Sequence, residues 1–197
     1  MGFFGKLFGK KPAVGKRAVT RSPHWGHVQT FVETMRKNRC DFLRDDQHSD
    51  GPIQIHHWHP FEDCKDAGRP ELELCLENLF AACETEKDKP AENHHNIACH
   101  LGDFKSFNAQ LAECVVTWKG LKGEEIKARP DFQKMAASKP VEYHAMTPDQ
   151  QKAFRADLDK NMPKDKITVW DGKNWTRNGK ILTPEQAVVP DPFFTKK

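Results

Sequence analysis

The chain has 197 residues, a formal net charge of +3, and only 37% hydrophobic against 30% charged residues. This length suits one ordinary domain or a smaller domain with long arms, and the 13 prolines favour the arms. The small positive charge, without basic clusters interleaved with aromatic residues, argues against nucleic-acid binding. No apolar run approaches the roughly 20 residues needed to cross a bilayer, so membrane contact would be peripheral.

Residues 1–21 form a basic arm that contains no acidic residue. An amphipathic, acid-poor start is typical of a mitochondrial address or of a segment that lies in a membrane interface. We expect it to stay uncleaved, as for import into the mitochondrial intermembrane space. Four apolar side chains would form the face that contacts a membrane or a partner protein, namely Phe3, Phe4, Leu7 and Phe8.

Residues 22–119 are predicted to form a helical domain. Its first helix would begin at Ser22 and Pro23, which suit the cap and the first turn. Apolar residues then recur at three- and four-residue steps from Trp25 to Leu43, with arginines and lysines outside the stripe. We expect this stripe to pack on the next part of the domain or on a partner.

Five of the six cysteines lie between Cys64 and Cys114, on two runs with helical period. The runs cover residues 72–83 and 97–118, and the short polar segment 84–93 would make them antiparallel neighbours. The pattern therefore predicts a helical hairpin that carries cysteines on both helices.

Helix geometry restricts which of these cysteines can pair. Residues fifteen apart differ by about 60° around a helix, so Cys99 and Cys114 can face one partner helix. A nested arrangement would pair Cys75 with Cys99 and Cys64 with Cys114. Cys40 and Cys83 would then stay unpaired. A pairing of Cys83 with Cys99 is the rival, because these two flank the loop, and the connectivity stays open.

This layout resembles the coiled-coil-helix-coiled-coil-helix (CHCH) family of mitochondrial intermembrane-space proteins, in which two cross-linked helices each carry a cysteine pair. The spacing departs from the family pattern, since Cys64 and Cys75 enclose ten residues whereas Cys99 and Cys114 enclose fourteen. The order of features is most similar to PDSW-type accessory subunits of respiratory complex I. The resemblance implies a disulfide-linked fold that is mostly α, and a non-catalytic accessory subunit that braces a large inner-membrane respiratory complex from the intermembrane-space side. ATP synthase and cytochrome oxidase are alternative hosts.

Histidine clusters raise a second hypothesis, a zinc-binding or redox-sensing domain. Neutral imidazole and thiolate are good zinc ligands, and two clusters could together close a tetrahedral site. The candidate ligands would be His56, His59, His95 and Cys99. No Cys-x-x-Cys motif accompanies them, and cysteines on helical faces pair well with each other. Our main expectation is therefore no metal and no other cofactor.

The C-terminal part divides into a linker, 120–146, and an arm, 147–197, with one helix and short strands. Thr147, Pro148 and Gln150 form a helix start with a capping box, which predicts a helix that ends near Asn161. Three short strand-like runs follow in residues 167–182, joined at Asp-Gly and Asn-Gly turns. No phosphate-binding loop, nucleophile elbow or metalloprotease motif is present, so we expect the protein not to be an enzyme.

Overall fold

The structure is a computed structural model, which describes residues 20–44, 46–47, 51–84, 93–138 and 140–188. The predicted contact face of Phe3, Phe4, Leu7 and Phe8 lies outside the described residues. Among the described helices, none combines the length and the apolar character that crossing a membrane requires.

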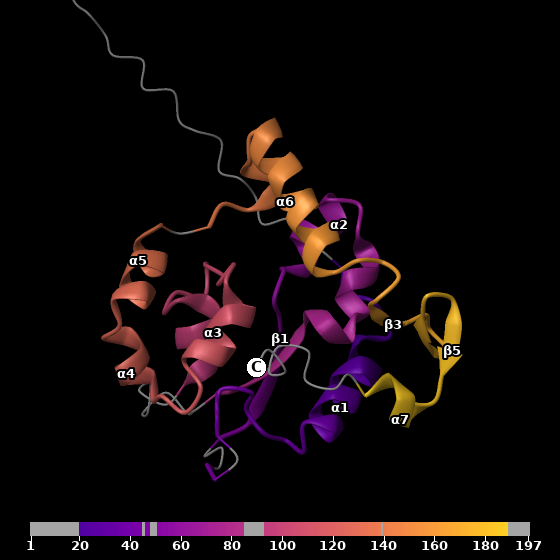
Figure 1. Ribbon diagram of the computed structural model, residues 1–197, viewed down its shortest axis with the longest axis horizontal. Coiled ribbons are helices and arrows are strands. Elements are labelled where there is room, and N and C mark those ends of the chain that lie inside the picture. The colour runs from indigo at the N-terminus through magenta and orange to yellow at the C-terminus, as the bar shows by residue number, and fades with distance from the viewer. Residues whose placement is uncertain (1–19, 45, 48–50, 85–92, 139, 189–197) are drawn as a thin grey trace, which may run out of the picture.

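A two-stranded antiparallel hairpin lies at the centre of the molecule (Figure 1). It pairs β1 (Ile53–His57) with β2 (Leu79–Cys83), and His56 lies opposite Phe80. Every residue of β2 is buried, because α1 packs against the hairpin on one side and the π-helix η4 contacts it as well. The run Leu-Phe-Ala-Ala-Cys is therefore a buried strand.

The helix α1 (Trp25–Met35) forms where the first helix was predicted, but it is shorter. Val28 and Val32 on its inner face are buried against the hairpin. Lys37 and Asn38 have left-handed backbone conformations, with φ of 52° each, which a continuing α-helix does not allow. The expected extension of the stripe to Leu43 is therefore wrong, although Phe42 still reaches the core.

Short helical segments connect the two central strands. They are α2 (Phe61–Asp66) and the 3-10 helices η1 (Pro70–Leu74) and η2 (Leu76–Asn78). Asn78, fully buried at the end of η2, donates from Nδ2 to the carbonyls of His59 and Leu72, and its Oδ1 accepts from the His59 amide at 2.8 Å. One side chain thus holds the chain just after β1 against the entry to β2.

The long helix expected over residues 97–118, the second arm of the predicted helical hairpin, does not form. In its place are a one-turn π-helix, η4 (His95–Cys99), a loop, and α3 (Leu111–Thr117). Leu101 and Gly102 take positive φ angles of 54° and 80°, which end the helical path. Asn108 then holds the loop to η4, because its backbone N–H donates to the Cys99 carbonyl and its side-chain Nδ2 donates to the Ala98 carbonyl.

The predicted fold class, a mostly α, disulfide-linked CHCH-like hairpin, is therefore wrong; the protein is a mixed α/β structure with two small sheets. All six cysteines lie within the described residues, and each is a buried thiol outside any disulfide. The physical reason is that the four cysteines predicted to pair lie on separate short elements instead of two long helices: Cys64 is on α2, Cys75 lies between η1 and η2, Cys99 is on η4 and Cys114 is on α3. They are held among apolar side chains of the core, as free cysteines commonly are. The four predicted to pair are Cys64, Cys75, Cys99 and Cys114.

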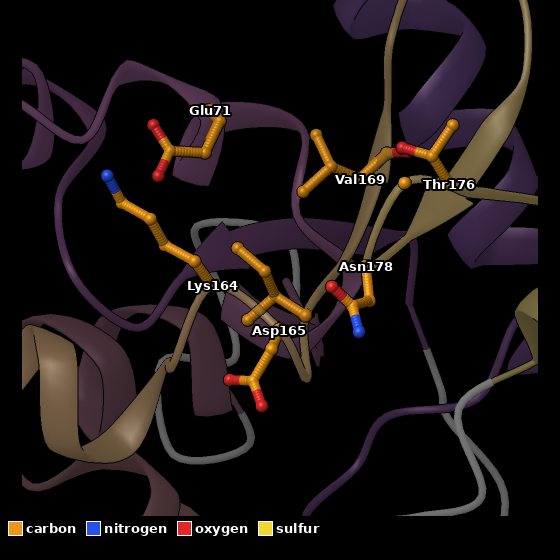
Figure 2. A pocket seen from close by; sticks show the side chains of 8 residues that line it. Glu71, Lys164, Asp165, Val169, Thr176 and Asn178 are labelled. Atoms are coloured by element: carbon orange, nitrogen blue, oxygen red, sulfur yellow. The ribbon is translucent and has the colours of Figure 1, made fainter.

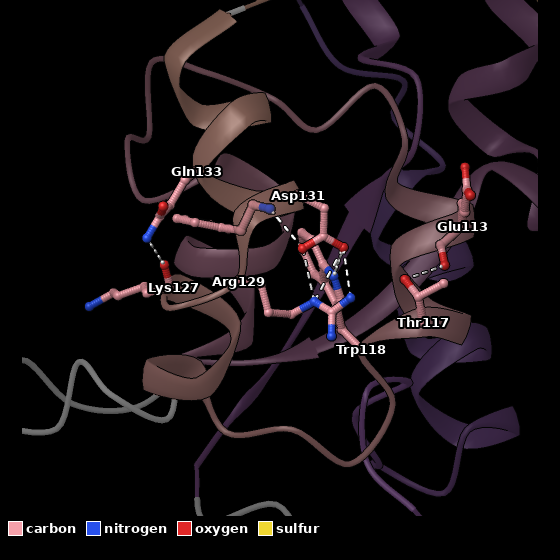
Figure 3. A network of polar contacts seen from close by, with 8 residues as sticks. Glu113, Thr117, Trp118, Lys127, Arg129, Asp131 and Gln133 are labelled. Atoms are coloured by element: carbon pink, nitrogen blue, oxygen red, sulfur yellow. Dashed lines mark hydrogen bonds and ion pairs between the residues drawn. The ribbon is translucent and has the colours of Figure 1, made fainter.

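The segment expected to be a linker contains α4 (Gly123–Lys127), α5 (Pro130–Ser138) and η5 (Tyr143–Ala145). Ile126 and Phe132 are buried in the main core. Figure 3 shows how a polar network fastens this part: the Asp131 carboxylate accepts from the Trp118 indole at 3.1 Å and from the Arg129 guanidinium at 2.9 Å. Residues 120–138 therefore belong to the folded body.

The C-terminal elements agree with the local sequence signals. The helix α6 (Pro148–Asn161) has the predicted capping box of Thr147 and Gln150. A three-stranded antiparallel meander follows: β3 (Thr168–Trp170), β4 (Trp175–Arg177) and β5 (Lys180–Leu182), and then the short α7 (Pro184–Ala187). Trp175 is buried, and its ring lies 4.5 Å from that of Phe31 on α1. The meander thereby covers part of α1.

Candidate metal centre

Three histidine side chains converge at the junction of the central hairpin and η4. They are His56 on β1, His95 at the first position of η4 and His100 directly after it. Their candidate ligand nitrogens all lie within 4.8 Å of one another. Tetrahedral metal–nitrogen bonds of about 2.1 Å place ligand nitrogens about 3.4 Å apart, so small rotations of the rings would close a site around one ion.

Strand alternation and an unusual helical turn bring these rings together. In β1, neighbouring side chains point to opposite faces, so His56 faces η4 while His57 faces α1, where its ring stacks on Trp25 at 4.8 Å. In an α-helix, residues five apart lie about 140° apart around the axis. The π turn bonds at i→i+5, which brings His95 and His100 back to one face.

Hydrogen bonds orient one of the rings and leave nitrogens of the other two without a partner. The Nδ1 of His100 lies 2.8 Å from the Ser106 carbonyl, so it carries the proton and its Nε2 keeps the lone pair that a metal needs. The Nδ1 atoms of His56 and His95 are buried and have no hydrogen-bond partner. The Glu84 carboxylate lies 3.9 Å from the His95 Nδ1. Buried polar atoms normally find partners, so these two nitrogens point to a missing one.

The electrostatics of the cluster keep all three imidazoles neutral at pH 7. Burial lowers the pKa of His56 well below its usual value, and the charges that His100 and His95 would carry lower it further. Burial, with the influence of His100, lowers the pKa of His95 to about 4. Burial also lowers the pKa of His100, against the bond to Ser106. Neutral imidazole is the form that binds metal, so no proton has to be displaced at neutral pH.

The three-histidine cluster is accessible from solvent. Its three members are half-buried rather than buried. Phe104 lies beside the rings of His95 and His100, at 5.8 and 5.0 Å, and is 58% exposed. An exposed apolar side chain next to a half-open set of ligands gives a small molecule or a polymer a surface to contact.

The structure brings together only part of the ligand set expected from the sequence. His56 and His95 meet, but His59 is buried elsewhere, with its Nε2 4.0 Å from the Asp157 carboxylate. Cys99 is fully buried in the core. His100 lies in the same histidine-rich segment as His95 but was not among the four expected ligands, because only the π turn places it on the same face as His95. The sequence signal that could have found it is the histidine at each end of His-Asn-Ile-Ala-Cys-His.

A shallow hollow of about 490 Å³ lies elsewhere, between η1 and the meander (Figure 2). Glu71, Lys164 and Asp165 stand at one side of it, and Val169 and Thr176 stand at the other. In this view the Lys164 amino group points toward the Glu71 carboxylate, whereas the Asp165 carboxylate points away from both. The charged side chains of the hollow do not form a convergent set like the three histidines, so the hollow is not part of the candidate site.

Comparisons with known proteins give no support for any family assignment: no protein-family model matches the chain, and neither does any curated protein or solved structure.

Proposed function

We propose that this protein is a metal-dependent hydrolase of anionic esters, in which His56, His95 and His100 hold one divalent transition-metal ion. The observation that carries the proposal is the convergence of three neutral imidazoles, two of which have a buried ring nitrogen without a hydrogen-bond partner. Three protein ligands with an open position are typical of catalytic metal sites, whereas structural sites are usually closed by four.

The donor set favours a particular group of metals. Imidazole nitrogens suit zinc, copper, iron and nickel, whereas magnesium and calcium prefer oxygen. Bound at three imidazoles, such an ion would supply a water of lowered pKa and would polarise an ester oxygen. The chain's own residues hold the ion and orient the rings, as the Ser106 carbonyl does for His100.

The charge of the site suggests the class of substrate. Three neutral imidazoles would leave the double charge on a bound divalent ion, with the Glu84 carboxylate 3.9 Å from the His95 Nδ1 as a neighbouring negative group. That ion would attract an anionic ester and stabilise its developing charge. A phosphodiester fits best, because a single metal can stabilise the phosphoryl oxygens during attack by water. The three histidines are partly buried, and the exposed Phe104 beside them offers a surface that a larger substrate could contact.

The accessory-subunit hypothesis stays a prediction. It depended on a disulfide-braced helical hairpin, and the six cysteines form no disulfide. Its complex I partner and intermembrane-space location therefore have no support from the described residues.

The proposal is tested by metal-dependent hydrolysis. The protein is stripped with a chelator, and zinc, nickel, cobalt or manganese is added back. The substrates are bis(p-nitrophenyl) phosphate and supercoiled plasmid DNA, whose nicking reports cleavage of a natural phosphodiester. We expect activity that returns with a transition metal and is lost in His95→Ala and His100→Ala.

The matched control is His144→Ala, because His144 is exposed on η5 and lies outside the cluster. Its activity should equal that of the unmodified protein. Tight metal binding at the three histidines without hydrolysis of either substrate would rule out the hydrolase, as would equal activity in the His95→Ala and control variants.

A further inference from the structure

We infer that Cys40, Cys83 and His94 form a second, structural metal site that binds zinc and fastens four segments of the core together. The three ligand atoms lie within 4.8 Å of one another, and all three residues are buried. This inference does not rest on the proposed hydrolase, because it concerns different residues and a different role.

The distances are close to those of a zinc site. The His94 Nδ1 lies 3.7 Å from the Cys40 sulfur and 2.9 Å from the Cys83 sulfur. Zinc–sulfur bonds of about 2.3 Å and zinc–nitrogen bonds of about 2.1 Å separate sulfur and nitrogen by about 3.6 Å in a tetrahedron. The first distance already fits, and the second needs an opening of about 0.7 Å.

The surroundings of His94 prepare its Nδ1 as the ligand atom. Its Nε2 lies 2.9 Å from the Leu121 carbonyl, so Nε2 carries the proton and Nδ1 keeps its lone pair. The Phe42 ring stacks on the imidazole at 5.3 Å with an interplanar angle of 2°, which fixes the ring plane. A backbone carbonyl on the far nitrogen is the usual support of a metal-binding histidine.

The position of the cluster explains what a metal would do there. Cys40 follows α1, Cys83 ends β2, His94 precedes η4, and Leu121 lies between α3 and α4. An ion bound to the first three would join segments up to 54 residues apart in sequence. It would also fix the start of η4, and with it the neighbouring ligand His95. The cluster supplies three protein ligands, one fewer than most structural zinc sites, so an enclosed water would have to complete the coordination. The two sulfur ligands and the burial of all three residues, rather than the number of ligands, favour a structural role.

Two other arrangements of the same atoms make different predictions. Cys40 and Cys83 could join as a disulfide when an external oxidant is present, with loss of two hydrogens. Alternatively, Cys83 and His94 could keep only their hydrogen bond. Thiolate ligation to an ion is distinguishable from both, because it has a spectroscopic signature that neither of the others has.

The experiment is a cobalt titration of the full chain under reducing conditions. Thiolate-bound Co²⁺ absorbs in the near ultraviolet by charge transfer, whereas cobalt at three imidazoles does not. We expect this absorption to saturate at one equivalent in a His56→Ala/His95→Ala double variant, and by two equivalents in the unmodified protein, where the three-histidine cluster also takes up cobalt. It should fall at least tenfold in Cys40→Ser and Cys83→Ser. The charge-transfer band and the hydrolysis assay can therefore fail independently.

A matched control and a second measurement guard against misfolding. Cys114→Ser replaces another buried cysteine of the same core, outside the cluster, and should keep the full band. Zinc X-ray absorption of the His56→Ala/His95→Ala variant should show two sulfur ligands. Absence of the charge-transfer band, its equal loss in Cys114→Ser, or zinc without sulfur ligands would each overturn the inference. A Cys40–Cys83 disulfide in protein purified without oxygen would overturn it too.

Discussion

His94 and His95 are neighbours in the chain, yet they belong to clusters of opposite character. His94 is buried with Cys40 and Cys83, whereas His95 is half-buried with His56 and His100. One cluster offers two sulfurs and one imidazole nitrogen on buried residues, and the other offers three neutral imidazole nitrogens on partly buried residues. Burial and donor type, rather than the presence of histidine, therefore separate a site that could stabilise the fold from one that could bind a substrate.

The largest effect on activity should come from removing a ligand of the three-histidine cluster. We expect His56→Ala, His95→Ala or His100→Ala to lower phosphodiester hydrolysis by more than about 100-fold, since changing even a supporting partner of a metal ligand costs 10- to 100-fold. Thermal unfolding of the metal-free protein should change little, because the rings are only partly buried and two of them contain a buried nitrogen that has no hydrogen-bond partner to lose. If every variant that loses activity also unfolds at a lower temperature, the three-histidine cluster supports the fold, and the proposed difference between the two clusters is wrong.

The buried cluster should show the reverse pattern. Removing its metal, or substituting Cys83→Ser, should lower the free energy of unfolding by about 3 kcal/mol, which corresponds to a fall of about 6–12 °C in unfolding temperature for a chain of this size. Calorimetry with and without chelator measures this. An unfolding temperature that chelation leaves unchanged in protein shown beforehand to contain zinc would contradict the structural role.

Asn78 tests whether the two clusters depend on the same part of the fold. Its side chain holds the chain directly after β1, the strand that carries His56. Asn78→Ala leaves the His59 backbone amide and carbonyl without their buried partner, which costs about 2 to 3 kcal/mol of stability. We also expect weaker metal binding at the three-histidine cluster and an unchanged cobalt–thiolate band. Asn161→Ala removes an exposed asparagine and should change neither quantity.

The smallest effect is a pH dependence that belongs to neither cluster. Burial is the main cause that raises the pKa of Asp63 from 3.8 to about 6. The folded state therefore binds this proton more tightly than the unfolded state, and the stabilisation is complete below about pH 4 and lost as the pH rises through about 6. Asp63→Asn keeps an acceptor for the Tyr143 amide, so it should gain stability relative to the unmodified protein over that interval. Chemical denaturation at pH 4, 5 and 6, with and without chelator, measures the difference. A constant difference across these pH values, or one that chelation abolishes, would contradict the assignment.

Local signals predicted the C-terminal elements well. Thr147 and Gln150 satisfy backbone groups within their own turn, and the Asp-Gly and Asn-Gly pairs supply the positive φ angles that tight turns need. Gly172 and Gly179 have φ of 101° and 72°. These interactions join residues a few positions apart, so they are readable without the rest of the fold.

The central hairpin could not be predicted in the same way. The apolar spacing of residues 72–83 fits a helix, but residues 79–83 pair with 53–57 and are buried on both faces. Periodicity alone does not separate a short buried strand from a buried helix. The predicted disulfides depended on that helix, so they were lost with it. Of the four candidate zinc ligands, His56 and His95 lie together, and metal binding itself stays a prediction.

The sequence by itself determined the capped helix α6, the turns of the meander and the presence of histidine and cysteine as metal-ligand types. Tertiary structure alone decided which of them meet. Pairing of β1 with β2 brought His56 and Cys83 to η4, and the π turn placed His94 and His95 in different clusters while returning His100 to the side of His95. The physical reason is that capping and turn formation are satisfied over a few residues, whereas ligand sets are assembled by long-range strand pairing and by burial.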